Sequence, residues 1–313
     1  MTRLPGIDLE LSPICLGTNT FGWTADAAAS HAVLDGFVAG GGTFIDTADM
    51  YSTWVPGNSG GESETIIGEW IAHRGRHDDV VIATKVAAHP DFRGLAAETV
   101  AAGCDASLAR LGVERIDLYY AHHDDAKRTI PEIAAAFDAL VRAGKVGAIA
   151  ASNFGPDRLR EWVEHARAEG LAAPVALQPE YHLLRRADFE GALQPTTEAL
   201  GLATFTYYGL ASGFLTGKYR SAADVGEGAR SGAVGTYATA EGFAVVDALV
   251  EVAQARGVAP ATVALAWLRA HGVTAPIASA RTAEQLPPLL AAGALELADD
   301  ERSRLDAVST PFA

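Results

Sequence analysis

The sequence predicts a (β/α)₈ barrel, in which eight parallel strands alternate with helices that cover the outside. Eight short runs rich in β-branched or aromatic residues recur along the 313 residues. Nearly all of them are apolar throughout rather than alternating, as expected for parallel strands covered on both faces. Ala-rich segments with helical spacing separate the runs, at a pitch of about 30 residues per strand–helix unit. A doubly wound open sheet fits less well, because no Gly-x-Gly-x-x-Gly fingerprint follows the first strand.

The predicted strands are the eight apolar runs themselves. In chain order they cover residues 13–18, 43–46, 80–85, 116–122, 146–153, 175–178, 202–207 and 274–279. The helices follow from the spacing of apolar residues between the runs. They are expected at residues 25–39, 62–72, 96–111, 131–143, 156–168, 188–200, 240–256, 260–270 and 282–291.

Proline and glycine mark the ends of several of these helices. Pro156 and Pro260 suit first-turn positions, where a missing N–H costs no hydrogen bond. Gly144, Gly170 and Gly257 each follow a predicted helix end, where glycine commonly stops a helix. These signals place the helix boundaries within a few residues.

One long insertion interrupts the regular pitch. Residues 209–239, rich in Gly, Ser and Ala, lie between the seventh and eighth strands, and a long loop at such a point is more often functional than accidental. An acidic run at residues 298–301 is expected to cap a final helix. No linker, charge block or repeat marks a boundary, so we expect one barrel domain spanning residues 1–313.

Composition and charge exclude several classes of protein. A hydrophobic fraction of 49% supplies one large core and excludes disorder. The 24 Lys and Arg against 39 Asp and Glu give a net charge of −15, which repels phosphate backbones and argues against nucleic-acid partners. No apolar run approaches the roughly 20 residues of a membrane span, and no signal peptide is visible. We therefore expect no membrane partner and a cytoplasmic protein.

Several conspicuous side chains are expected to be structural. Cys15 and Cys104 are too few for a disulfide framework and are expected to be buried as small apolar residues. Trp70, Trp162 and Trp267 fall on predicted helices and are expected to pack in the core.

Polar residues end nearly every predicted strand. In a barrel of this kind the carboxyl ends of the strands meet at one rim, where active sites lie. The rim residues are Asp46 with Tyr51 five positions later, Lys85, His122, Ser152, Asn153, Gln178, Tyr207, Tyr208, Ser279 and Arg281. One polar residue after a strand usually caps a helix, but so many at one rim indicate a binding site.

Four of these residues predict chemistry on a carbonyl group. Lys85 would lie at the barrel mouth with Asp46 of the neighbouring strand as its charge partner. An ammonium near the Tyr51 phenol is expected to lower the phenol pKa from about 10. Tyr51 would then donate a proton to a carbonyl oxygen as hydride arrives at the carbon. His122, as a neutral donor, would orient the carbonyl and stabilise the developing oxyanion.

Other interpretations of the same residues stay open. Lys85 and Asp46 could form a purely structural ion pair, with Tyr51 a surface aromatic. Lys85 could instead be the Schiff-base lysine of an aldolase, although an adjacent carboxylate opposes the low pKa that this role requires. A metal site in the His-His-Asp-Asp run at 122–125 is not expected, because adjacent residues at a strand end point opposite ways and no third ligand is evident.

Longer motifs surround the rim residues. In order they are Phe-Ile-Asp-Thr-Ala-Asp-Met-Tyr at 44–51, Gly-Glu-Ser-Glu at 61–64, Ile-Ala-Thr-Lys at 82–85, Arg-Leu-Gly at 110–112, Asp-Leu-Tyr-Tyr-Ala-His at 117–122, Ser-Asn-Phe at 152–154, Gln-Pro-Glu-Tyr at 178–181, Gly-Phe-Leu-Thr-Gly-Lys-Tyr at 213–219 and Ser-Ala-Arg-Thr-Ala-Glu-Gln at 279–285. Together they resemble the aldo-keto reductases, over nearly the whole chain and in the expected order. The resemblance implies a (β/α)₈ barrel that binds a nicotinamide cofactor, usually NADPH, without a Rossmann fold or a metal.

The resemblance also implies roles by position. Tyr51 matches the general acid, Asp46 and Lys85 match the residues that tune it, and His122 matches the residue that positions the substrate carbonyl. The matches to the nicotinamide end of the cofactor site are Gly17, Thr18, Asn19, Asp46, Ser152, Asn153, Gln178 and Tyr207. The matches to the pyrophosphate and adenosine ends are Tyr208, Gly209, Leu210, Ser212, Gly213, Lys218, Arg230, Ser279, Arg281 and Gln285.

Some positions bear on cofactor choice or depart from the usual pattern. Arg281, in a loop leading into a helix, is a reasonable 2′-phosphate site and favours NADPH, although NADH is not excluded. Tyr208-Gly209 replaces a frequent Ser-Pro, which is expected to change how the loop meets the pyrophosphate. Leu289 replaces an Asn that often contacts the adenine, so that contact is expected to be absent. His123 stands where an aromatic residue or Arg is common.

The predicted function is NADPH-dependent reduction of an aldehyde or ketone. Trp23 and Trp54, on loops after the first two strands, are candidate walls of an apolar pocket for this small carbonyl substrate. The alternative is an NADP-binding sensor or regulatory subunit with little catalysis, resembling channel-associated members of the superfamily. Retention of His122 argues against that alternative. Neither the substrate nor the oligomeric state follows from the sequence.

Overall fold

A parallel sheet of eight strands forms the centre of the protein. The computed structural model describes residues 2–226 and 231–313. The strands are β1 (Cys15–Gly17), β2 (Phe44–Asp46), β3 (Val81–Val86), β4 (Ile116–Ala121), β5 (Val146–Ser152), β6 (Ala176–Gln178), β7 (Ala203–Thr204) and β8 (Ile277–Ala278). Their order in the sheet is β7-β6-β5-β4-β3-β2-β1-β8, and every pair is parallel.

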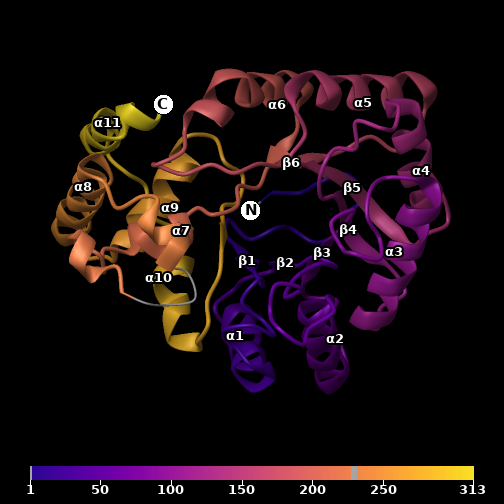
Figure 1. The fold of residues 1–313 in the computed structure, drawn as a ribbon, viewed down its shortest axis with the longest axis horizontal. Helices are drawn as coiled ribbons and strands as arrows, with labels where there is room; N and C mark the ends of the chain where they lie inside the picture. Colours follow the sequence, from indigo (N-terminus) through magenta and orange to yellow (C-terminus); the bar gives the residue numbers. More distant parts are fainter. Residues whose placement is uncertain (1, 227–230) are drawn as a thin grey trace.

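Hydrogen bonds between the segments of β7 and β8 close this sheet into a barrel. The Thr274 N–H donates to the Thr204 carbonyl at 2.9 Å, and the Ile277 N–H donates to the Thr206 carbonyl at 2.9 Å. Figure 1 shows the resulting ring of strands with helices around it. The predicted (β/α)₈ barrel is confirmed.

The two strands at this closure are shorter than predicted. Residues 202–207 were expected as one strand, but β7 covers only Ala203–Thr204. The Tyr207 N–H still donates to the Pro179 carbonyl at 3.0 Å. Because Pro179 has no N–H to continue a regular ladder, the extended chain continues past the strand without forming one.

The helices lie outside the strands in alternation with them (Figure 1). They are α1 (Ala27–Ala39), α2 (Glu62–Arg74), α3 (Ala97–Leu111), α4 (Ile130–Arg142), α5 (Pro156–Glu169), α6 (Gln194–Leu200), α7 (Ser231–Gly235), α8 (Ala240–Arg256), α9 (Pro260–Ala270), α10 (Leu286–Ala291) and α11 (Asp299–Val308). Pro156 and Pro260 begin α5 and α9, and Gly170 ends α5 with a left-handed φ of 66°. The Glu301 carboxylate accepts the Ala298 N–H at 2.8 Å, so the acidic run caps α11 as predicted.

Proline divides two of the predicted helices. The segment predicted as one helix at 188–200 is a π-turn, η1 (Phe189–Leu193), followed by α6, because Pro195 supplies no N–H for a continuous ladder. The segment predicted at 282–291 is a 3₁₀ turn, η4 (Ala283–Gln285), followed by α10 with two prolines in its first turn. The insertion holds two more 3₁₀ turns, η2 (Ala211–Thr216) and η3 (Ala222–Asp224), and η5 (Thr310–Phe312) ends the chain.

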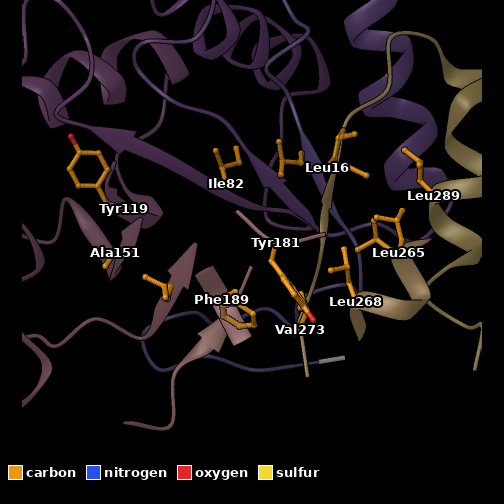
Figure 2. Close-up of a cluster of buried hydrophobic side chains, with 14 of the residues drawn as sticks. Leu16, Ile82, Tyr119, Ala151, Tyr181, Phe189, Leu265, Leu268, Val273 and Leu289 are labelled. Carbon is orange, nitrogen blue, oxygen red and sulfur yellow. The ribbon is translucent and has the colours of Figure 1, made fainter. Parts of the chain in front are cut away.

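The core has two parts, one on each side of the strands. Outward-facing strand side chains such as Leu16 and Ile82 form one cluster with helix side chains such as Leu265 of α9 (Figure 2). A second cluster fills the barrel, and Leu4, Ile7 and Leu11 of the N-terminal segment belong to it. The predicted burial of both cysteines and of three helical tryptophans is confirmed for Cys15, Cys104, Trp70, Trp162 and Trp267. Among the described helices, none has the length and apolar character of a membrane span.

Candidate active site

The alternation of side chains along each strand brings the rim residues together. In β3, Val81 and Ala83 belong to the cluster inside the barrel, whereas Ile82 and Val86 face the helices. The period of two therefore directs Lys85 inward at the carboxyl end of β3. The same alternation directs Asp46, Ser152 and Gln178 inward from the carboxyl ends of β2, β5 and β6.

Lys85 is the centre of this site and is fully buried. Its Nζ donates to Asp46 Oδ2 at 2.6 Å, to the Thr47 carbonyl at 2.7 Å and to Tyr51 Oη at 3.0 Å. These three acceptors use all three protons of an ammonium, so the site holds Lys85 in its charged form. The predicted pairing of Lys85 with Asp46 is confirmed by this geometry. A Schiff-base role, which needs a free neutral amine, is disfavoured.

The predicted lowering of the Tyr51 pKa is wrong for this arrangement. Burial, followed by the negative charge of Asp46, holds the Tyr51 pKa well above its ordinary value. Burial disfavours the phenolate, and the Asp46 carboxylate, 2.6 Å from Lys85 Nζ, offsets the field of the ammonium at the phenol. Tyr51 is therefore a protonated phenol at neutral pH. Its hydroxyl lies 3.4 Å from Asp46 Oδ2, a long contact that leaves the proton available to a third group.

His122 is neutral, as predicted. Burial and then the Lys85 charge hold its pKa well below the ordinary value. Its Nδ1 is buried and has no hydrogen-bond partner among the described residues. A buried N–H without an acceptor costs more than a bare acceptor nitrogen, so the ring proton belongs on Nε2. The ring centroid lies 6.3 Å from that of Tyr51.

One expectation about the neighbouring histidine is wrong. His122 and His123 were expected to point in opposite directions, but their rings stack in parallel, with centroids 4.9 Å apart and planes 2° from parallel. β4 ends at Ala121, so both residues lie beyond the alternation that the regular strand imposes. Over the described residues, no group of three His, Cys, Asp or Glu side chains is placed to hold a metal ion.

The residues predicted to hold the nicotinamide form one hydrogen-bonded network with Asp46. Gln178 Nε2 donates to Asp46 Oδ1 at 2.8 Å, and the Ser152 hydroxyl donates to the Gln178 carbonyl at 2.8 Å. Asn153 donates to Ser152 Oγ at 3.1 Å and accepts the Tyr207 hydroxyl at 2.8 Å. These contacts fix the side chains around Asp46.

The first-strand loop meets the end of β8. The Ser279 hydroxyl donates to Asn19 Oδ1 at 2.8 Å, which joins a predicted nicotinamide residue to a predicted adenosine residue. Thr18 is fully buried, and its hydroxyl donates to the Asp46 carbonyl at 2.9 Å. A Cβ at Gly17 would lie 2.9 Å from Ser279 Oγ, so only glycine leaves room for this contact.

The loop at 208–213 has an unusual backbone. Tyr208, Ala211 and Ser212 all have positive φ, between 47° and 57°, and Gly213 has a φ of 96°. A Cβ on Gly213 would lie 3.6 Å from Lys218 Nζ, so this cation lies directly beside the loop backbone.

The other predicted phosphate-end residues lie around this loop or outside the described part. Gly209 packs under α9, where a Cβ would lie 3.0 Å from Leu268. Leu210 packs against the outer core beside Gly209, and its carbonyl accepts the Gly213 N–H. Arg230, also predicted here, lies outside the described residues.

The loop after β8 presents an exposed guanidinium. Arg281 is exposed, and its backbone N–H donates to Gln285 Oε1 at 2.9 Å. Gln285 therefore caps this turn with the oxygen that was predicted to serve the adenosine. Leu289 is buried in the outer core.

Aromatic rings border the site on the side of Tyr51. The Trp54 ring lies 6.2 Å from the Tyr51 ring and 5.7 Å from the Trp23 ring, both in edge-to-face geometry. Trp54 remains 43% exposed, which is rare for such a large apolar side chain. The two tryptophans therefore pack against each other beside Tyr51, and their role as a pocket wall stays a prediction.

Three participants were missed by the sequence analysis. The Thr47 carbonyl accepts from Lys85, and no residue type signals a backbone acceptor. Tyr120 places its ring centroid 5.7 Å from Lys85 Nζ, and the period of two along β4 could have found it. Asp49 is fully buried without a hydrogen-bond partner for either carboxyl oxygen among the described residues.

Comparison with known proteins agrees with this geometry. A sequence profile of the aldo/keto reductase family matches residues 13–310. The oxidoreductase YrpG of Bacillus subtilis is 35% identical over 296 residues, covering 91% of this chain and 88% of its own. Norsolorinic acid reductase stcV of Emericella nidulans is 33% identical, covering 95% of this chain and 78% of its own. A putative voltage-gated potassium channel subunit beta of Schizosaccharomyces pombe is also 33% identical, over 77% of this chain and 72% of its own.

Proposed function

Because this chain belongs to the aldo/keto reductase family and is an oxidoreductase, we propose that it reduces an aldehyde or ketone to the alcohol with NADPH. Tyr51 is the general acid in this proposal. The observation that carries it is the fully buried Lys85 ammonium, which donates to Asp46 and to Tyr51 Oη at 3.0 Å. The three Lys85 protons are used in these hydrogen bonds and in one to the Thr47 carbonyl, so the Tyr51 hydroxyl proton is the one available to a substrate.

The residues act on the carbonyl oxygen from two sides. Tyr51 Oη donates its proton to that oxygen, and the Lys85 ammonium 3.0 Å away stabilises the phenolate that remains. His122 donates a hydrogen bond from Nε2 to the same oxygen and orients the carbonyl. The raised pKa of Tyr51 keeps its proton in place before the reaction, which suits a donor in the direction of reduction.

The residues around the site fit a nicotinamide dinucleotide. When bound, this cofactor supplies the hydride for the carbonyl carbon. Ser152, Asn153 and Gln178 would hold its carboxamide. For the phosphates, the chain offers Lys218 beside the backbone of Gly213, with no carboxylate partner for Lys218 in the described residues. The support here is the Lys218 cation alone, because the Ala211 and Gly213 N–H groups already donate to the Tyr208 and Leu210 carbonyls.

Tyr51→Phe tests the proposed acid. The ring and its packing against Trp54 are retained while the donated proton is lost, so turnover should fall by about 10²- to 10⁴-fold. NADPH binding, measured by quenching of tryptophan fluorescence, should change little. Tyr119→Phe is the matched control, because that buried hydroxyl has no described partner and faces the helices. Near-normal turnover in Tyr51→Phe would exclude the proposed role.

Arg281→Ala tests the preference for NADPH. Loss of a charge-assisted contact to the 2′-phosphate should weaken NADPH binding by about 10- to 100-fold and leave NADH binding unchanged. The substitution retains the hydrogen bond that caps this loop, because Gln285 Oε1 accepts from the backbone N–H of residue 281 rather than from its side chain. Equal weakening of both nucleotides in fluorescence titrations would show that Arg281 does not read the 2′-phosphate.

A second candidate function follows from the channel subunit among the relatives. The chain would then bind NADP as a sensor, with little catalysis. NADPH binding without oxidation of NADPH in the presence of any aldehyde or ketone would favour this alternative over reduction.

A further inference from the structure

A pocket of about 470 Å³ lies at the same end of the barrel as the candidate active site. It is formed by two loops, one after β3 and one after β4. The first contributes Ala87 and Arg93, and the second contributes His123, Lys127 and Arg128. None of these residues has a role in the mechanism above.

The two loops are joined by Asp125. Its carboxylate accepts the Leu95 N–H at 3.0 Å, which connects the two loops, and the Lys127 N–H of its own loop at 3.0 Å. Gly94 permits the contact, because it has a φ of 87° and a Cβ there would lie 2.9 Å from Asp125 Oδ2. The Gly94 N–H donates in turn to the Ala87 carbonyl at 3.0 Å. The walls of the pocket are therefore fixed before any ligand binds.

The acidic residues of the pocket leave a net positive charge. Asp124 Oδ2 accepts from Arg158 Nε at 2.5 Å, so a cation outside the pocket lining matches its charge. The Leu95 amide is the first cause of the lowered pKa of Asp125, and the charges of Arg128 and Lys127 also lower it. One carboxylate therefore stands against three cations of the pocket lining.

Those cations have few partners of their own. Within the described residues, Arg93 and Lys127 form no ion pair, and Arg128 is only 3.8 Å from the exposed Glu132. A pocket with unpaired positive charge is conspicuous on a chain whose net charge is −15. Its field attracts anions that the rest of the surface repels.

The pocket borders His122 through His123 and lies apart from the candidate phosphate-binding cations. The His123 ring lies 4.9 Å from His122, and His122 lies 6.3 Å from Tyr51. His123, which lines the pocket, therefore stacks directly on His122, the residue proposed to orient the carbonyl. The candidate phosphate-binding cations Lys218 and Arg281 follow β7 and β8, which stand apart from β3 and β4 in the sheet order.

We propose that this pocket is a substrate subsite that binds an anionic group, so that the preferred substrates are aromatic or apolar carbonyl compounds carrying a carboxylate. This rests on the proposed carbonyl reduction. The tryptophan wall contacts the apolar body, Tyr51 and His122 take the carbonyl oxygen, and Arg93, Lys127 and Arg128 bind the carboxylate.

The test compares 4-carboxybenzaldehyde with methyl 4-formylbenzoate, which share a ring and a reacting carbonyl but differ in charge. Wild-type kcat/KM should favour the acid by about tenfold or more, as one or two charge-assisted hydrogen bonds provide. Arg93→Ala and Lys127→Ala should each reduce that preference several-fold, and the double variant should remove most of it. The ester should be reduced at the wild-type rate throughout.

Arg76→Ala is the matched control, because it removes an exposed cation at the amino end of β3, away from the rim. An acid-to-ester ratio near one in the wild type, or a ratio that changes no more in the pocket variants than in Arg76→Ala, would overturn the subsite. If neither aldehyde is reduced, the proposed function fails and calorimetry with terephthalate still tests the pocket. Binding to the wild type that is lost in the double variant would support the subsite, and no binding to the wild type would overturn it.

Discussion

Two buried acids lie three positions apart after β2, and their surroundings differ sharply. Asp46 accepts from Lys85 at 2.6 Å and from Gln178 at 2.8 Å, so its charge is matched by donors. Asp49 has no described hydrogen-bond partner for either carboxyl oxygen. Burial, and then the nearby Glu64 charge, raise the pKa of Asp49 to about 8. This raised pKa favours the protonated form of Asp49 in the folded protein at neutral pH.

Asp49→Asn should therefore change how stability depends on pH. Because the folded-state pKa is raised, the unfolded chain loses this proton from about pH 4 upward while the folded protein keeps it until about pH 8. Wild-type stability should fall over that window relative to the variant, by as much as a few kcal/mol. Urea titrations between pH 5 and 9 measure the difference. Asp78→Asn, at an exposed acid, is the control, and an Asp49→Asn difference that is constant with pH would contradict the assignment.

The sequence was informative about which rim residues meet and less so about their protonation. The Asp46–Lys85 pair could be predicted because adjacent parallel strands end at one rim. The pKa of Tyr51 could not, since its direction depends on burial and on how closely Asp46 matches the charge of Lys85. Roles of individual cofactor residues remain predictions.

At the scale of elements, α2 and α3 pack unusually closely. Gly68 in α2 lies against the end of α3, where a Cβ would come 2.1 Å from the Arg110 carbonyl oxygen. Arg110 in turn donates to Glu64 of α2 at 2.6 Å, which ties the two helices together behind the site. The contact requires glycine although glycine weakens a helix.

Gly68→Ala should destabilise the protein despite the better helix propensity of alanine. The gain of about 1 kcal/mol in propensity is outweighed by a backbone clash that costs about 1–3 kcal/mol or more once α2 is displaced. Thermal or urea unfolding measures the net loss. Gly191→Ala in η1 is the control, since no atom lies within 4 Å of its added Cβ, and a Gly68→Ala protein as stable as this control would show that α2 shifts freely.

Elements were predicted best where a local signal and the global fold agree. The run at 80–85 begins with four apolar residues and has no polar alternation there, and the corresponding strand is β3. The helices divided at Pro195 and at the prolines of α10 were predicted as continuous, because the apolar spacing persists across a residue that cannot donate. The stacking of His122 on His123 could not be predicted from the sequence, because both residues follow the end of β4, where side chains no longer alternate between the two faces.

On the scale of the whole molecule, closure of the barrel assembles one reactive centre from residues far apart in the chain. The segments of β7 and β8 join through Thr204 and Thr274, which closes the ring. β1 pairs with β8, so the first-strand loop comes next to the end of β8 and Asn19 meets Ser279. The barrel was predictable from the strand pitch, and a single domain spanning 1–313 remains a prediction. The balance of charge around the rim was not predictable, because it depends on pairs between residues distant in the sequence, such as Asp124 with Arg158.

The most direct test of the central claim follows the hydride itself. NADPH deuterated at C4 would be incubated with the protein and a panel of aromatic and aliphatic aldehydes and ketones, and the alcohols analysed by mass spectrometry. The account predicts one deuterium on the carbinol carbon of the product, formed by the wild type and by Tyr119→Phe but at least about 100-fold more slowly by Tyr51→Phe. Bound NADPH with no deuterated alcohol from any member of the panel, or equal rates in Tyr51→Phe and wild type, would contradict it.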